Sequence, residues 1–211
     1  ASVLTDEETI YADLLPAICQ MSGVGKFSRV ELQKQLSGNT AHVAVNASAY
    51  SSGISGSSSP KDLETLLQLV YLHLTQPRFN ETDYQTVMNI VKAQVENLES
   101  NPDYLMQKRT TEIAYGNNPR RQELSKETIA KYKFENLAPI YSKLFPNGYS
   151  FTYYFVGNVD LEVLKPLVEK YVGSLPVAKK VTNKFTDDKV REVKGVENDF
   201  TAKMEQPKVS V

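Results

Sequence analysis

The side chains of this sequence that could do chemistry are few and lie far apart. It has two histidines, His42 and His73, which are 31 positions apart, and one cysteine, Cys19. A catalytic zinc site needs three protein ligands, and the helical motif His-x-x-Glu-His supplies two of them four residues apart. A cysteine nucleophile needs a histidine base within hydrogen-bonding reach. Neither pattern is recognisable, so we interpret both histidines as structural and Cys19 as a buried apolar side chain of a helix.

Two other groups of residues have the composition of a site but not its spacing. Glu96, Glu99 and Asp103 recur at helical spacing, which is typical of a solvated helix face and not of a cation-binding loop. The segment 53–57 is rich in Gly and Ser, like a phosphate-binding loop, but no Lys-Ser or Lys-Thr follows it. We interpret that segment as a turn from a strand into a helix.

A small basic spot at Arg120 and Arg121 is interpreted as part of a surface loop. A docking site for a neighbouring domain or for the terminus of a substrate stays open as the alternative. We therefore predict no catalytic and no metal-binding residue in this chain, and its substrate-binding residues stay unassigned.

Composition excludes several classes of function. The 211 residues are 41% hydrophobic, enough for a sizeable core, and carry 24 basic and 25 acidic side chains. This balance excludes a broad basic surface for nucleic acid. No apolar run approaches the roughly 18 residues of a membrane span, and the first residues lack the basic and apolar regions of a signal peptide. A single cysteine cannot form a disulfide within the chain.

Capping and turn signals divide the chain into many helices and a few strands. Ser28, Asn80 and Asp160 each precede an apolar pattern of helical period, as N-cap residues do. Residues 41–57 predict a hairpin, and the aromatic segment 149–156 predicts a further strand. Further helices are predicted at residues 10–18, 59–74, 102–115 and 125–144. The order of elements predicts an α+β fold, with helices packed on one face of a mainly antiparallel sheet.

Several segments, in this order, resemble the pitrilysin/insulinase family of zinc metallopeptidases. They are SGVGKFSRVELQKQLSG from Ser22, GISGSSSPKDLETLLQL from Gly53, LTQPRF from Leu74, and YYFVGNVD with LVEKYVGSLP between Tyr153 and Pro176. The resemblance covers residues 8–176 and implies a metallohydrolase domain of the mitochondrial-processing-peptidase type.

The resemblance places Leu14, Ala17 and Ile18 where a catalytic domain carries His-x-x-Glu-His. The family's third ligand would fall at residues 94–96, where Glu96 alone cannot hold a metal. The resemblance thus implies a non-catalytic domain, with zinc in a separate domain of the parent protein. Such domains complete a chamber that encloses unfolded peptide. The implied partners are the catalytic domain of the same parent chain and a peptide substrate, and the implied location is the bacterial periplasm.

We divide the chain into an inactive peptidase-like domain at residues 1–176, a charged linker at 177–199 and the first strand of a following domain at 200–211. Domains of this family begin with one or two further strands, which nothing supplies before Ser2. An incomplete sheet with an open edge is therefore expected, with self-association through that edge as a possibility. Two other functions stay open. One is an interaction module of a non-proteolytic assembly, and the other is a free-standing enzyme, against which the lack of a dense polar constellation argues.

Overall fold

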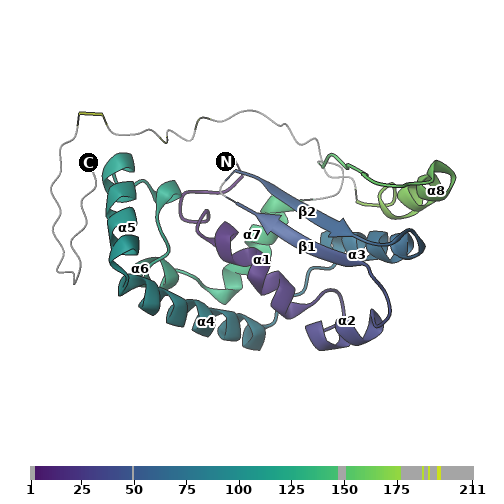
Figure 1. Cartoon of the computed structure of the whole chain (residues 1–211), viewed down its shortest axis with the longest axis horizontal. Coiled ribbons are helices and arrows are strands. Elements are labelled where there is room, and N and C mark those ends of the chain that lie inside the picture. Colours follow the sequence, from purple (N-terminus) through teal and green to yellow (C-terminus); the bar gives the residue numbers. More distant parts are fainter. Residues whose placement is uncertain are drawn as a thin grey trace.

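The computed structural model describes residues 3–48, 50–146 and 151–176, together with positions 187, 190, 194 and 195. Short helices and one hairpin open the chain, long helices follow, and a further helix is the last described element (Figure 1). The α-helices are α1 (Tyr11–Ser22), α2 (Arg29–Gln35), α3 (Leu63–Thr75), α4 (Glu81–Glu99), α5 (Pro102–Tyr115), α6 (Lys126–Ile129), α7 (Leu137–Leu144) and α8 (Leu161–Tyr171). The strands are β1 (His42–Ala47) and β2 (Ser52–Ser57), and single 3-10 turns lie at Pro60–Asp62, Pro119–Arg121 and Phe134–Asn136.

The two strands pair antiparallel, and their buried side chains share one face. Val45 lies opposite Ile54, and both pack in the main core, whereas Asn46 on the other face is exposed. Two residues beyond Ile54, a Cβ on Gly56 would come within 2.6 Å of Leu66 Cδ1 in α3, so α3 covers the same face. These contacts confirm the predicted α+β class, with helices on one face of an antiparallel sheet.

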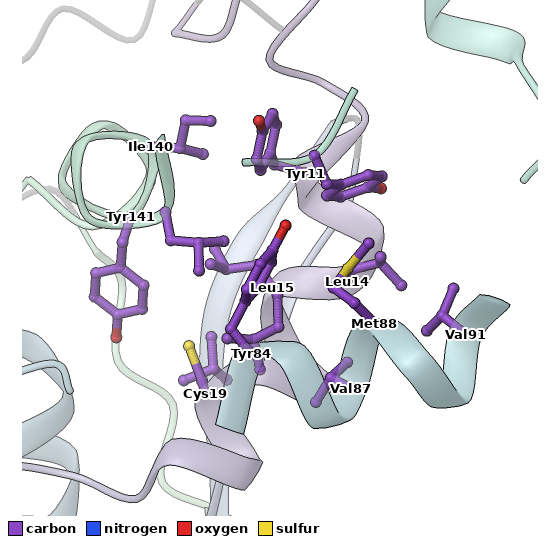
Figure 2. Close-up of a cluster of buried hydrophobic side chains, with 14 of the residues drawn as sticks. Tyr11, Leu14, Leu15, Cys19, Tyr84, Val87, Met88, Val91, Ile140 and Tyr141 are labelled. Atoms are coloured by element: carbon purple, nitrogen blue, oxygen red, sulfur yellow. The ribbon is translucent and has the colours of Figure 1, made fainter. Parts of the chain in front are cut away.

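The main hydrophobic core lies where α1 contacts β1, α4 and α7. Figure 1 shows α1 between the hairpin and α4, and Figure 2 shows the side chains that these elements bring together. Leu15, Ile18, Val95 and Leu137 are each completely buried. Helix α1 runs unbroken through Pro16. Apolar side chains at i, i+3 and i+4 give α1 and α4 their buried faces.

Helix α3 is buried on more than one side, as its wide apolar face predicts. Leu67 is 4% exposed, and Leu69 joins a second cluster with Val24 and Ala41 under the start of the hairpin. His73 in the same helix is also buried. A helix that is apolar on several faces must be covered on several faces. Here the hairpin and α8 both lie against α3.

Two tyrosines fasten the first helix to residues far along the chain. The hydroxyl of Tyr11 donates to the carbonyl of Lys131 at 3.1 Å and accepts bonds from the Lys133 amide and Asn136 Nδ2. The hydroxyl of Tyr132 donates to the carbonyl of Ile10, and its ring centroid lies 4.9 Å from that of Tyr11. Nothing in the local sequence around Tyr11 indicates these partners.

The prediction of a strand at residues 149–156 is wrong for the part of this segment that the structure describes. Residues 149 and 150 lie outside the described residues, and 151–156 form no strand. Within the described residues the sheet contains β1 and β2 alone. The composition of the segment is right for a strand, but a strand exists only as a member of a hydrogen-bonded ladder.

The predicted domain division falls largely outside what can be described. Most of the charged linker at 177–199 and all of the expected strand at 200–211 belong to residues that the structure does not describe. The boundary after residue 176 stays a prediction.

Replacing Asn80 with alanine should lower the free energy of unfolding by about 1 kcal/mol, the usual cost of losing an N-cap. The Asn80 side chain accepts a hydrogen bond from the Asp83 amide at 3.1 Å and begins α4, which carries five core residues. Urea unfolding would measure the loss. Asn97→Ala, an exposed change inside the same helix, is the control and should be neutral or slightly stabilising. Equal effects of the two changes would contradict the cap.

Candidate functional site

The place where the resemblance puts a zinc motif is filled with apolar side chains. Leu14 and Ile18 of α1 are buried, and Ala17 between them is exposed. Helix α4 packs against α1, and Met88 and Val91 of α4 join Leu14 in the main core (Figure 2). Carbon side chains have no lone pair for a metal and no proton to exchange. In the described residues, the contact between α1 and α4 at this place is an apolar packing surface.

Helix α4 is also apolar on its inner face at residues 94–96, where the third ligand is expected. Val95 is completely buried, while Gln94 and Glu96 on either side of it are exposed. Helical spacing explains this outcome, because the inner face of α4 takes every third or fourth residue and holds Val91 and Val95. Across residues 3–48, 50–146 and 151–176, no three His, Cys, Asp or Glu side chains come together as a possible metal site.

The histidines and the cysteine occupy positions suited to structural roles. His42 is exposed at the start of β1, and His73 is buried in α3, where burial lowers its pKa to about 4. The imidazole of His73 is thus neutral at pH 7. Its backbone carbonyl accepts a hydrogen bond from the hydroxyl of Tyr141 at 2.8 Å. Burial raises the pKa of the Cys19 thiol to about 12, so the thiolate that a nucleophile requires does not form at neutral pH.

The two clusters that had the composition of a site have ordinary structural explanations. Glu99 binds Lys126, with 3.2 Å between Oε2 and Nζ, whereas Glu96 is exposed. Residues 53–57, interpreted as a strand-to-helix turn, form most of β2 instead. Pairing with β1 fixes them as a strand, and the turn begins only after Ser57.

The basic spot divides into two different roles that the sequence did not separate. Arg120 has a side chain only 7% exposed, with Nε 2.7 Å from Asp6 Oδ1 and Nη2 donating to the carbonyl of Leu4 at 2.8 Å. Arg121 is exposed, and its guanidinium lies 5.6 Å from the ring centroid of Tyr50 and 5.1 Å from that of Tyr115. Arg120 thus anchors the first residues of the chain, whereas Arg121 is exposed and lies against two aromatic rings.

No family model matches the chain. Among curated proteins, the zinc protease PQQL-like of Arabidopsis thaliana is 28% identical over 144 residues, which cover 68% of this chain and 15% of that protein. The probable zinc protease PqqL of Escherichia coli is 24% identical over 154 residues, which cover 73% of this chain and 16% of that protein. The chain is a homologue of PqqL-like zinc proteases. This confirms the predicted relationship to the pitrilysin/insulinase family, and the chain spans about a sixth of each of these curated relatives.

Solved structures show the same fold. The periplasmic protease PqqL from E. coli matches over 90% of this chain and 21% of its own, with a TM-score of 0.73 and 19% identity. An inactive domain of peptidase M16 from Pseudomonas fluorescens matches over 63% of this chain and 32% of its own, with a TM-score of 0.53 and 19% identity. In the described part of this PqqL homologue, no helix has the length and apolarity to cross a bilayer.

Proposed function

We propose that this chain is a non-catalytic domain of a zinc metalloendopeptidase. The observation that carries the proposal is the apolar contact between α1 and α4, where Leu14 and Val91 lie in the core. In a homologue of zinc proteases, the loss of metal chemistry at this position leaves a structural or binding role. The likeness to a solved structure described as an inactive peptidase domain supports the same conclusion.

In this proposal the zinc belongs to a separate domain of the parent protein, and this domain helps to enclose and bind a peptide substrate. The curated relatives are about six times as long as the matched region, which leaves ample chain for a catalytic domain. Among the described residues, Arg121 is the best candidate for contact with a peptide or a neighbouring domain. Its exposed guanidinium lies against the rings of Tyr50 and Tyr115. We also propose a periplasmic location, since the E. coli homologue is a periplasmic protease.

The 211-residue chain should bind no zinc with micromolar or better affinity. The reason is that the motif positions are apolar and no three potential ligands converge in the described residues. Metal analysis after dialysis and calorimetry with zinc would measure this. His42→Gln removes the exposed imidazole and serves as the control for adventitious binding. A stoichiometric site that persists in His42→Gln, together with hydrolysis of an unfolded peptide, would overturn the proposal.

Reconstitution tests the role in the parent enzyme. The gene should encode a His-x-x-Glu-His motif outside this chain. The domain that carries the motif should hydrolyse an unfolded peptide faster when this chain is present than when it is absent. Arg121→Ala should reduce that gain, whereas Lys92→Ala, an exposed change on α4, should leave it unchanged. A parent gene without the motif would overturn the proposal and favour an interaction module of a non-proteolytic assembly.

A further inference from the structure

Arg121 differs from most other arginines of the chain in what it binds. Arg78, Arg109 and Arg120 each form an ion pair with a carboxylate. In the part of the chain that the structure describes, the side chain of Arg121 is exposed and forms neither a hydrogen bond nor an ion pair. A guanidinium has five N–H donors in a rigid plane. All of those of Arg121 are therefore open to a group that approaches from the solvent.

Two aromatic rings from different elements flank this guanidinium. Tyr50 lies in the turn of the hairpin, and Tyr115 is the last residue of α5. The Cζ atom of Arg121 lies over both rings, 5.6 Å from the centroid of Tyr50 and 5.1 Å from that of Tyr115. The π faces attract the cation without supplying an oxygen acceptor to its N–H groups. The rings thus hold the charge in place and leave its hydrogen-bonding capacity unused.

The backbone that carries Arg121 is fixed by a tight corner after α5. Gly116 ends that helix with a φ of 59°, in the left-handed region, which reverses the chain. The Arg121 amide then donates to the carbonyl of Asn118 at 2.9 Å. The preceding residue, Arg120, is anchored by a side chain that is only 7% exposed. The guanidinium of Arg121 is therefore positioned in advance, which reduces the entropy lost when a ligand binds.

The hairpin turn on the other side of the contact is also held by its own hydrogen bonds. The Ser48 amide donates to the carbonyl of Ser51 at 2.8 Å, and Ser48 Oγ accepts from the Tyr50 amide at 3.3 Å. Two fixed turns thus bring together one arginine and two tyrosines. Arginine and tyrosine are among the residue types that contribute most to binding where proteins meet their partners.

We propose that Arg121, beside Tyr50 and Tyr115, binds an acidic side chain of an unfolded peptide. A carboxylate matches the guanidinium because its two oxygens accept two parallel hydrogen bonds from the planar fork. Arg121 and Tyr50 are both exposed, so the peptide can continue past the contact in both directions. The bound group is therefore a Glu or Asp within the peptide and not its end. This inference rests on the proposed function and adds to it a preference for acidic sequences.

Three short, flexible, acetylated peptides test the preference on the 211-residue chain. The first contains one Glu and ends in an amide, so that this Glu has its only carboxylate. The second has Gln in place of the Glu, and the third is the Gln peptide with a free C-terminal carboxylate. The Glu peptide should bind about fivefold more tightly than either Gln peptide, as expected for one charged pair at an exposed site. Fluorescence anisotropy of labelled peptides would measure the affinities.

Variants assign the preference to the guanidinium of Arg121. Arg121→Ala should bind the Glu and Gln peptides equally. Arg121→Lys should retain part of the preference, because it keeps the charge and loses the planar fork. Arg29→Ala is the matched control, since it removes an exposed guanidinium from α2 and should keep the full preference. In the original chain the preference should disappear toward 1 M salt, where the screening length is about 3 Å.

Three results would overturn the inference. One is equal binding of the Glu and Gln peptides by the original chain. Another is a preference that survives in Arg121→Ala, or that Arg29→Ala loses to the same extent. The third is tighter binding of the Gln peptide with the free terminus than of the Glu peptide, which would make the site a receptor for a chain end.

The binding measurement separates this inference from the proposed function. A preference that depends on Arg121, without faster hydrolysis on reconstitution with the catalytic domain, would leave the site and remove the proposed role. Faster hydrolysis without any preference for the Glu peptide would leave the role and remove the site.

Discussion

Leu15→Ala is expected to lower the free energy of unfolding by about 3–5 kcal/mol, the upper part of the range for truncating a buried leucine. Leu15 is completely buried in α1, at the centre of the core in Figure 2. It is surrounded by elements that are tied to one another, so the site cannot collapse around the smaller side chain. The loss combines the transfer free energy of the removed carbons with the cost of the cavity. Urea unfolding followed by circular dichroism would measure it.

Ile90→Ala is the matched control for this change. Ile90 lies in α4 and is 48% exposed, so its truncation should cost well under half as much as that of Leu15. Alanine also favours the helix slightly at both positions, which cancels in the comparison. A Leu15→Ala protein that loses less than Ile90→Ala would mean that α1 is not at the centre of the core.

The second large effect is a loss of stability in acid that depends on His73. Burial lowers its pKa from 6.5 to about 4, so between these values the unfolded chain binds the proton and the folded chain does not. The contribution of neutral His73 to the free energy of unfolding is therefore fully present above pH 6.5, and it is lost as the pH falls toward 4. The full shift corresponds to roughly 3 kcal/mol. Urea unfolding at pH 7 and pH 4 would measure the loss.

His73→Leu keeps the site apolar and removes the titration. Its stability should fall less between pH 7 and pH 4 than that of the original chain, by roughly 3 kcal/mol. The carboxylates contribute to acid unfolding in both proteins and cancel in the difference. His42→Gln, at an exposed position, controls for the loss of a histidine as such. Identical pH dependence in His73→Leu and the original chain would mean that the ring is hydrated in the folded state.

Local signals made much of this fold predictable. The caps at Ser28, Asn80 and Asp160 each bind backbone amides at the start of a helix. The hairpin was also predicted, because alternation within residues 41–57 is strong. Thr5 and Glu8 make the reciprocal bonds of a capping box, yet the α-helix begins only at Tyr11. A local pattern can thus form its own contacts without setting the boundary of an element.

Other features depend on distant partners and could not be predicted. Residues 151–156 have strand composition, but their state depends on which backbone lies next to them. Arg120 looked like half of a surface pair, and its contact with Asp6 joins positions 114 residues apart. At the candidate site, the absence of ligands at Leu14 and Ile18 was clear from residue types. Residue types did not show that Val91 and Met88 fill the same space, because this depends on how α4 packs against α1.

The bonds of Tyr11 and Tyr132 also determine when the molecule can finish folding. They join the first helix to residues about 120 positions later, so the core around α1 cannot close until that part of the chain exists. Helices α3 and α4 are neighbours in sequence and can form early, whereas α1 must await residues 131–136. During synthesis at the ribosome, the apolar face of α1 is therefore not fully covered until residues 131–144 have been made. Such delayed closure slows folding and makes the nascent chain a substrate for chaperones.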